Sequence, residues 1–139
     1  MSILIIGGAY QGKLAYVNTI YKGEILSGQN IDEEVFMQAS CINELHLFVK
    51  KLLNDGVAPD DITNFIIANT EAKIIICDDI CSGIVPIDET ENQWRETTGR
   101  LLCDLSKKVD TVIRMQCGIP QTIKGSEISY AKVEKEKKW

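Results

Sequence analysis

The first residues of the chain that could do chemistry form a glycine-rich segment ending in a lysine. It consists of Gly7, Gly8, Ala9, Tyr10, Gln11, Gly12, Lys13 and Leu14, and it matches the pattern G-x-x-x-x-G-K-[ST] at every position but the last. Glycines let the backbone curl so that successive N–H groups point at phosphate oxygens, and a lysine adds a mobile positive charge. The pattern predicts a phosphate-binding loop in which all eight residues contact a nucleotide and Lys13 is catalytic.

Leu14 is the one departure from that pattern. The usual serine or threonine hydroxyl at this position ligates Mg²⁺ beside the phosphates, and a leucine side chain has no atom that can do so. We therefore expect a weakened Mg²⁺ site, whereas phosphate binding needs only the loop amides and Lys13.

A pair of acidic residues, Asp78 and Asp79, follows the apolar run Ile74–Cys77. An acid at the end of a buried strand is typical of the residue that holds the Mg²⁺ shell in P-loop proteins. We take both as candidate metal ligands and Asp79 also as a candidate catalytic residue. The alternative, that they are ordinary turn residues after a strand, stays open.

Strands and helices that could position these residues are visible in the hydrophobic pattern. Continuous apolar runs predict strands buried on both faces, and apolar residues three and four apart predict amphipathic helices. We expect strands at 2–6, 34–39, 73–77 and 111–115, a short extended piece at 121–124, and helices at 11–21, 42–53, 59–69 and 89–108. Loops are expected at 24–32 and 81–86. The alternation predicts an α/β fold with a mostly parallel sheet and flanking helices, of the P-loop nucleotide-binding type.

Length and charge narrow the possible partners. The 139 residues fit one α/β domain, which we place at 1–125, followed by a charged tail at 126–139. The net charge of −5 and the pI near 4.9 disfavour a nucleic-acid partner. We find no apolar run of the ~20 residues that span a bilayer and no secretion signal, so we expect a cytoplasmic protein without membrane contact.

Three other residue types are interpreted as structural. The sequence has five cysteines, and an odd number without a leader predicts reduced, mostly buried thiols. The single histidine, His46, falls in an expected helix off its apolar stripe, and we expect it at the surface or rim. Trp94 lies on the apolar face of another expected helix and is assigned to the core.

Several segments resemble one enzyme family in order and spacing. They are residues 5–13, the stretch Asp78-Asp79-Ile80-Cys81-Ser82-Gly83-Ile84-Val85-Pro86, the pattern Trp94-Arg95-Glu96-x-x-Gly99-Arg100, residues 110–112, and Gly118-Ile119-Pro120 with Lys124. Together they are similar to the bifunctional adenosylcobinamide kinase/adenosylcobinamide-phosphate guanylyltransferase family.

That resemblance implies phosphoryl transfer from GTP or ATP, with Mg²⁺, to a hydroxyl in cobalamin biosynthesis. It also implies a cobamide precursor as partner and a homo-oligomer. The family segment that carries the guanylylated histidine is shortened here to 21–34 and contains no histidine, so we expect guanylyltransferase activity to be lost. A catalytically inactive homologue acting as a regulatory or protein-interaction subunit is the alternative.

Overall fold

The computed structural model describes residues 2–80 and 88–125. The expected loop at 81–86 and the charged tail at 126–139 lie outside these residues. The elements in chain order are β1 (Ile3–Gly7), α1 (Lys13–Ile20), β2 (Leu26–Ser27), α2 (Glu33–Gln38), β3 (Cys41–Asn43), α3 (Leu45–Asn54), α4 (Pro59–Asn69), β4 (Ile74–Asp78), α5 (Glu89–Lys108), β5 (Thr111–Gln116) and β6 (Ile119–Lys124).

Within the described residues the strands form a six-stranded sheet in the order β2-β3-β4-β1-β5-β6. The pairs from β2 to β5 are parallel and β6 is antiparallel to β5. In the centre, Ile3 of β1 lies opposite Ile74 of β4 on one side and Thr111 of β5 on the other. The expected α/β fold is confirmed, and the three strongest apolar runs are its three central strands.

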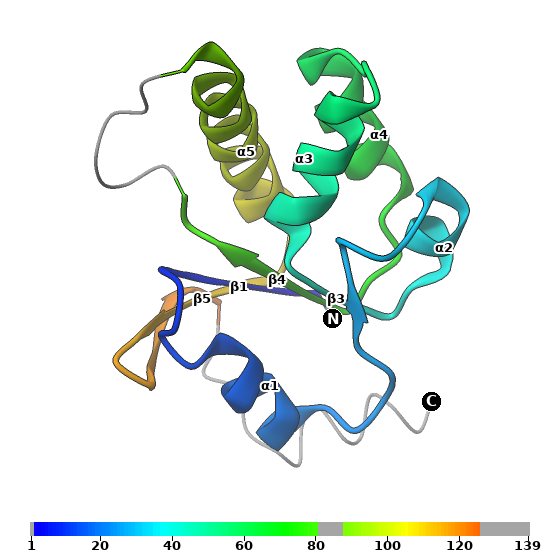
Figure 1. Ribbon diagram of the computed structural model, residues 1–139. Coiled ribbons are helices and arrows are strands. Elements are labelled where there is room, and N and C mark those ends of the chain that lie inside the picture. The colour runs from blue at the N-terminus through cyan, green and yellow to red at the C-terminus, as the bar shows by residue number, and fades with distance from the viewer. Residues whose placement is uncertain (1, 81–87, 126–139) are drawn as a thin grey trace.

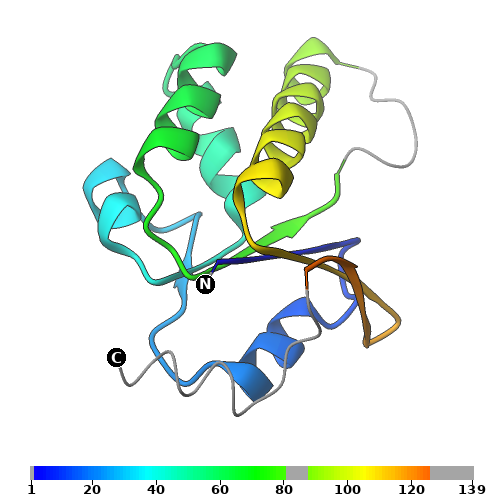
Figure 2. The same ribbon diagram turned by 180° about the vertical axis from the view of Figure 1, so that it is seen from behind.

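Helices cover both faces of the sheet, as Figures 1 and 2 show from opposite sides. On one face α2, α3, α4 and α5 pack against Leu4, Ile75 and Val112. On the other face α1 packs against Ile5 and Ile76. Alternate residues of β1 and β4 therefore belong to two separate cores, and this is why those strands are continuous apolar runs.

The expected strand at 34–39 is wrong, because Glu33–Gln38 is helix α2. Asp32 caps the helix by accepting the Val35 amide at 2.8 Å, and two glutamates occupy the first turn, where the helix dipole favours negative charge. Phe36 then stacks on Phe48 of α3, with ring centroids 4.8 Å apart. The capping aspartate and the two glutamates therefore favour a helix at these residues over a strand.

The expected helix at 42–53 begins later, at Leu45. Cys41–Asn43 is instead strand β3, which pairs with β4 through Cys41 and Ile74 and with β2 through Ile42 and Leu26. The residues 24–32, expected to be a loop, accordingly contain the two-residue strand β2. By contrast, the helices expected at 59–69 and 89–108 are confirmed as α4 and α5.

The end of the sheet is a hairpin between β5 and β6. Its two connecting residues, Cys117 and Gly118, have φ of 52° and 76°, the left-handed pair that a two-residue hairpin of type I′ requires. Pro120 is tolerated in β6 because this is an edge strand. The expected extended piece at 121–124 is thus the second half of a longer strand.

The expectation of mostly buried thiols holds for Cys41 and Cys77 but not for Cys103 and Cys117, which are exposed. Burial raises the pKa of the Cys41 thiol to about 12.

Candidate functional site

The glycine-rich segment lies where the sheet changes its winding direction. From β1 the chain continues through α1 on one face, and from the neighbouring β4 it continues to α5 on the other face. Gly7, the last residue of β1, lies opposite Asp78, the last residue of β4. In open α/β sheets a ligand-binding crevice forms at the carboxyl ends of two such strands. The fold therefore brings the predicted loop and the predicted acidic pair to one crevice.

The backbone of the loop alternates between left-handed and right-handed conformations. Tyr10 and Gly12 are left-handed, with φ of 62° and 91°, whereas Gln11 has a negative φ and Lys13 begins the right-handed helix α1. Such alternation turns consecutive N–H groups toward one point and forms an anion-binding concavity. Tyr10 is not a glycine, so its left-handed conformation costs about 1 kcal/mol.

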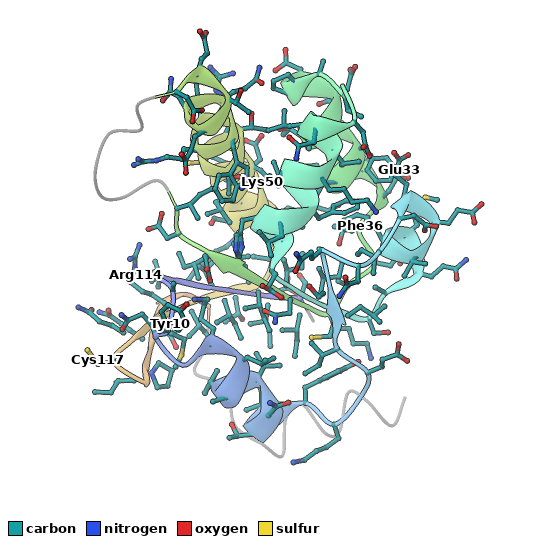
Figure 3. All side chains as sticks on the ribbon, viewed as in Figure 1. Tyr10, Glu33, Phe36, Lys50, Arg114 and Cys117 are labelled. Carbon is teal, nitrogen blue, oxygen red and sulfur yellow. The ribbon has the colours of Figure 1, made fainter. Side chains whose placement is uncertain are left out.

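The hairpin between β5 and β6 supports the loop from the side. Oε1 of Gln11 accepts the Cys117 amide at 2.6 Å, and the Gln11 carbonyl accepts the Gly118 amide at 3.0 Å. A Cβ atom on Gly12 would lie 3.2 Å from the Gly118 Cα. Tyr10 and Cys117 accordingly appear at the same edge of the molecule in Figure 3. The loop is thus held against the hairpin by two hydrogen bonds and one close backbone contact.

Gly7 is required by close packing. A Cβ atom at this position would lie 2.6 Å from the carbonyl oxygen of Met115 in β5, closer than side-chain carbons approach oxygen. The first glycine of the pattern therefore lets the chain leave β1 between its two neighbouring strands.

Lys13 is buried, with 7% of its surface exposed, and its ammonium group points back into the loop. Its Nζ donates to the carbonyl of Gly8 at 2.6 Å and to that of Gly7 at 3.2 Å. The same Nζ lies 2.7 Å from Oδ1 of Asp78. The predicted lysine and one of the predicted carboxylates are therefore a direct ion pair.

The neighbouring carboxylate, Asp79, points elsewhere. Its amide donates to the Gly7 carbonyl at 2.8 Å, while its Oδ2 lies 3.7 Å from Nη2 of Arg114 on β5. Within residues 2–80 and 88–125 we find no group of three histidine, cysteine or acidic side chains that could hold a metal ion. The two aspartates thus belong to one site but not to one pre-formed ligand set.

Leu14, the remaining predicted contact, occupies the first turn of α1 with 42% of its surface exposed. No hydroxyl stands at this position.

His46 was expected at the surface or rim, but it is buried, with 5% of its surface exposed. The Asp78 amide donates to Nδ1 of His46 at 3.2 Å, so Nδ1 is an acceptor and the ring proton is on Nε2. Nε2 lies 3.4 Å from Oδ2 of Asp78. Burial lowers the pKa of His46, although the Asp78 carboxylate acts in the opposite direction. The histidine therefore contacts both the backbone and the carboxylate of Asp78.

Sequence reasoning missed His46 because β3 was not foreseen. A histidine in the first turn of a helix that follows a strand lies near the carboxyl edge of the sheet, and that signal becomes readable once the strand is known. Trp94, assigned to the core, packs beside it half-buried and donates from Nε1 to the His46 carbonyl at 2.7 Å. Nζ of Lys50 lies 4.5 Å from the centre of the Trp94 ring.

Glu44 is a second residue that the sequence did not single out. It lies between β3 and α3 in a left-handed conformation, with φ of 58°, and its carboxylate accepts the Ser27 hydroxyl at 2.9 Å. Glu44 thus ties the short strand β2 to the same edge of the sheet.

Comparison with known proteins adds no family assignment: no protein-family model matches this chain, and no curated protein is significantly similar to it. None of the helices in the described part of the chain is both long and apolar enough to span a bilayer.

Proposed function

We propose that the loop from Gly7 to Lys13 binds the phosphate groups of GTP or ATP. The observation that carries this proposal is the alternating backbone of Tyr10, Gln11, Gly12 and Lys13 beside a buried lysine. The N-terminus of α1 supports it, because no side chain caps its free amides and its dipole favours an anion. A strained Tyr10 is better explained by a binding loop than by a connection that binds nothing.

The reaction we propose is transfer of the γ-phosphoryl group to a hydroxyl, as the resemblance to adenosylcobinamide kinases implies. A new bond forms between the acceptor oxygen and the γ-phosphorus, and the bond from that phosphorus to the β–γ bridging oxygen breaks. Lys13 stabilises the negative charge on the phosphoryl oxygens, and Asp79 takes the hydroxyl proton. The acceptor implied by the resemblance is a cobamide precursor.

A Mg²⁺ ion is compatible with the residues present, although they hold it weakly. Mg²⁺ often uses only one or two carboxylates together with substrate phosphates and water, and Asp78 and Asp79 provide those carboxylates. When bound, the ion neutralises charge on the phosphates. Because Oδ1 of Asp78 is already paired with Lys13 and Leu14 cannot ligate, we propose that the substrate phosphates and water supply most of the ligands.

The second candidate is a nucleotide-binding subunit that does not turn over. Leu14 favours it, because its exposed side chain stands where a metal-ligating hydroxyl would be needed for efficient transfer. In such a subunit, bound nucleotide regulates an interaction with another protein and no phosphoryl group is transferred.

Calorimetric titration of the full chain with GTP and ATP, with and without Mg²⁺, tests the shared part of both candidates. We expect measurable binding that falls about 10- to 150-fold in Lys13→Ala, the equivalent of one charge-assisted hydrogen bond of ~1.5–3 kcal/mol. Lys22→Ala is the matched control, because this exposed lysine follows α1 and donates a long hydrogen bond, of 3.3 Å, to the Asn18 carbonyl. Equal binding by wild type and Lys13→Ala refutes phosphate binding by the loop.

Product analysis then separates the two candidates. Nucleoside diphosphate formed only when a hydroxyl acceptor is present supports the kinase, and tight binding without any diphosphate supports the regulatory subunit. A protein mass increase equal to GMP would contradict the expected loss of guanylyl transfer.

A further inference from the structure

A groove of about 760 Å³ runs along α5 at the carboxyl edge of the sheet, and its charge is unlike that of the rest of the molecule. The sequence contains three arginines, Arg95, Arg100 and Arg114, and all three line this groove together with Lys107. The chain as a whole has a net charge of −5, whereas among the residues that the structure describes these four cations share the groove with two acids, Asp79 and Glu96. Arginine gathered in one place is typical of oxyanion recognition.

Two of the arginines are held only loosely by these acids. Arg114 is 41% exposed, and its contact with Asp79, at 3.7 Å, is longer than a hydrogen bond. Arg100 pairs with Glu96 at 3.0 Å, but both side chains are more than half exposed, and such helix-surface pairs contribute little. A guanidinium group has five N–H donors, so these contacts leave donors for a ligand.

The floor of the groove is apolar and its size suits a small molecule. Ile6 of β1 and Leu102 of α5 contribute apolar surface, and Gly99 and Cys103 add little bulk on the facing side of the helix. The volume is within the range of about 300–1,000 Å³ that is usual for small-ligand sites.

The groove adjoins the glycine-rich loop. Ile6 directly precedes Gly7, and Asp79, which borders the groove, donates its amide to the Gly7 carbonyl at 2.8 Å. In Figure 3 Arg114 lies at the same edge of the molecule as Tyr10 of the loop. A ligand in the groove would therefore have one end beside the loop that we propose binds the phosphates.

We propose that this groove binds the phosphoryl acceptor, and that the acceptor is a molecule with an apolar body that carries an oxyanion. The body packs on Ile6 and Leu102, the oxyanion is held by Arg100 and Arg114, and the hydroxyl end lies at Asp79. This assignment of substrate class rests on the proposed phosphoryl transfer. The acceptor is thus defined by the charge of the groove and not by the resemblance, and it carries a phosphate or a carboxylate.

Binding of an anionic aromatic dye in the absence of nucleotide tests the groove by itself. The dye 8-anilinonaphthalene-1-sulfonate is titrated by fluorescence and then displaced by 1-naphthyl phosphate, 1-naphthoate or 1-naphthol. We expect the phosphate and the carboxylate to displace it at least about tenfold better than the neutral naphthol, and their order tells which oxyanion is preferred. Equal displacement by all three would show non-specific apolar binding and overturn the proposal.

Variants locate the binding. Arg100→Gln and Arg114→Gln should each weaken 1-naphthyl phosphate about tenfold, the equivalent of one charge-assisted hydrogen bond, without affecting 1-naphthol. Cys103→Trp should weaken all three probes by filling the groove while leaving its charges in place. Lys22→Gln, which removes a positive charge outside the groove, should have no effect. Unchanged phosphate binding in both arginine variants would overturn the proposal.

The outcomes for the groove and for the loop can be distinguished. Probe binding that depends on the arginines, in a protein that binds neither GTP nor ATP, supports an oxyanion site but overturns its role as acceptor site. Nucleotide binding that depends on Lys13, in a protein whose groove binds no probe, overturns the groove and leaves the proposed function standing.

Discussion

Replacing Asp78 by asparagine should change stability and nucleotide affinity in opposite directions. The carboxylate lies 2.7 Å from the ammonium group of Lys13, which is 7% exposed, so Asp78→Asn leaves a buried cation with only the carbonyls of Gly7 and Gly8. Breaking a buried ion pair costs about 3–5 kcal/mol, and we reduce this because the Asp78 side chain is 26% exposed. We expect the free energy of unfolding to fall by roughly 2–3 kcal/mol.

The same substitution should strengthen binding of nucleotide in the absence of Mg²⁺. Asp78 neutralises Lys13 and repels a phosphate in the neighbouring loop, and removing one such charge near the surface contributes on the order of 1 kcal/mol, or about fivefold in affinity. The increase in nucleotide affinity that added Mg²⁺ produces should become smaller at the same time, because Asp78 is a candidate ligand of the ion. Urea denaturation and calorimetric titration of GTP and ATP measure the two effects.

Two controls make this prediction specific. Asp79→Asn removes the adjacent charge but keeps the ion pair between Asp78 and Lys13, so it should lower stability less than Asp78→Asn does. Asp104→Asn removes an exposed carboxylate of α5 and should change neither quantity. If Asp78→Asn weakens metal-free nucleotide binding while the protein stays folded, Asp78 does not compete with phosphate for Lys13 and our account of the site is wrong.

Three further predictions concern single residues of the site. Gly7→Ala should lower the free energy of unfolding by about 1–3 kcal/mol in urea denaturation, because its Cβ would lie 2.6 Å from the Met115 carbonyl oxygen. An unchanged urea midpoint would show that β5 can move away from the added Cβ without loss of stability. Leu14→Thr should increase the effect of Mg²⁺ on nucleotide affinity, and calorimetry that shows no increase would mean that α1 does not present its first turn to the phosphates. Because burial lowers the pKa of His46, the unfolded chain binds a proton on this residue more readily than the folded protein does. The contribution of His46 to the free energy of unfolding is therefore fully present above about pH 6.5 and is lost as the pH decreases. His46→Gln should reduce this dependence in thermal unfolding at pH 5 and pH 7.5, and an unchanged slope would assign it to other groups.

Local sequence determined the elements that need no distant partner. The runs at 3–6 and 74–77 are apolar without interruption, and 111–115 is apolar apart from Thr111 and Arg114. Such strands are covered on both sides, and this can be read without knowing what covers them. Helix α5 begins at its capping residue Asp88 and ends before β5, as its periodicity and charges predict. The glycine pattern likewise fixed the phosphate-binding hypothesis, since glycine and lysine at that spacing are required by the loop itself.

Tertiary structure decided which side chains meet. Cys41–Asn43 has an apolar pattern compatible with the start of a helix, and only its pairing with β4 makes it a strand. That pairing places α3 over the end of β4, which buries His46 against Asp78. Arg100 and Arg114 are brought to one groove because β5 returns beside β1 after α5. Contacts of this kind depend on strand order, which hydrophobic periodicity along one segment does not encode.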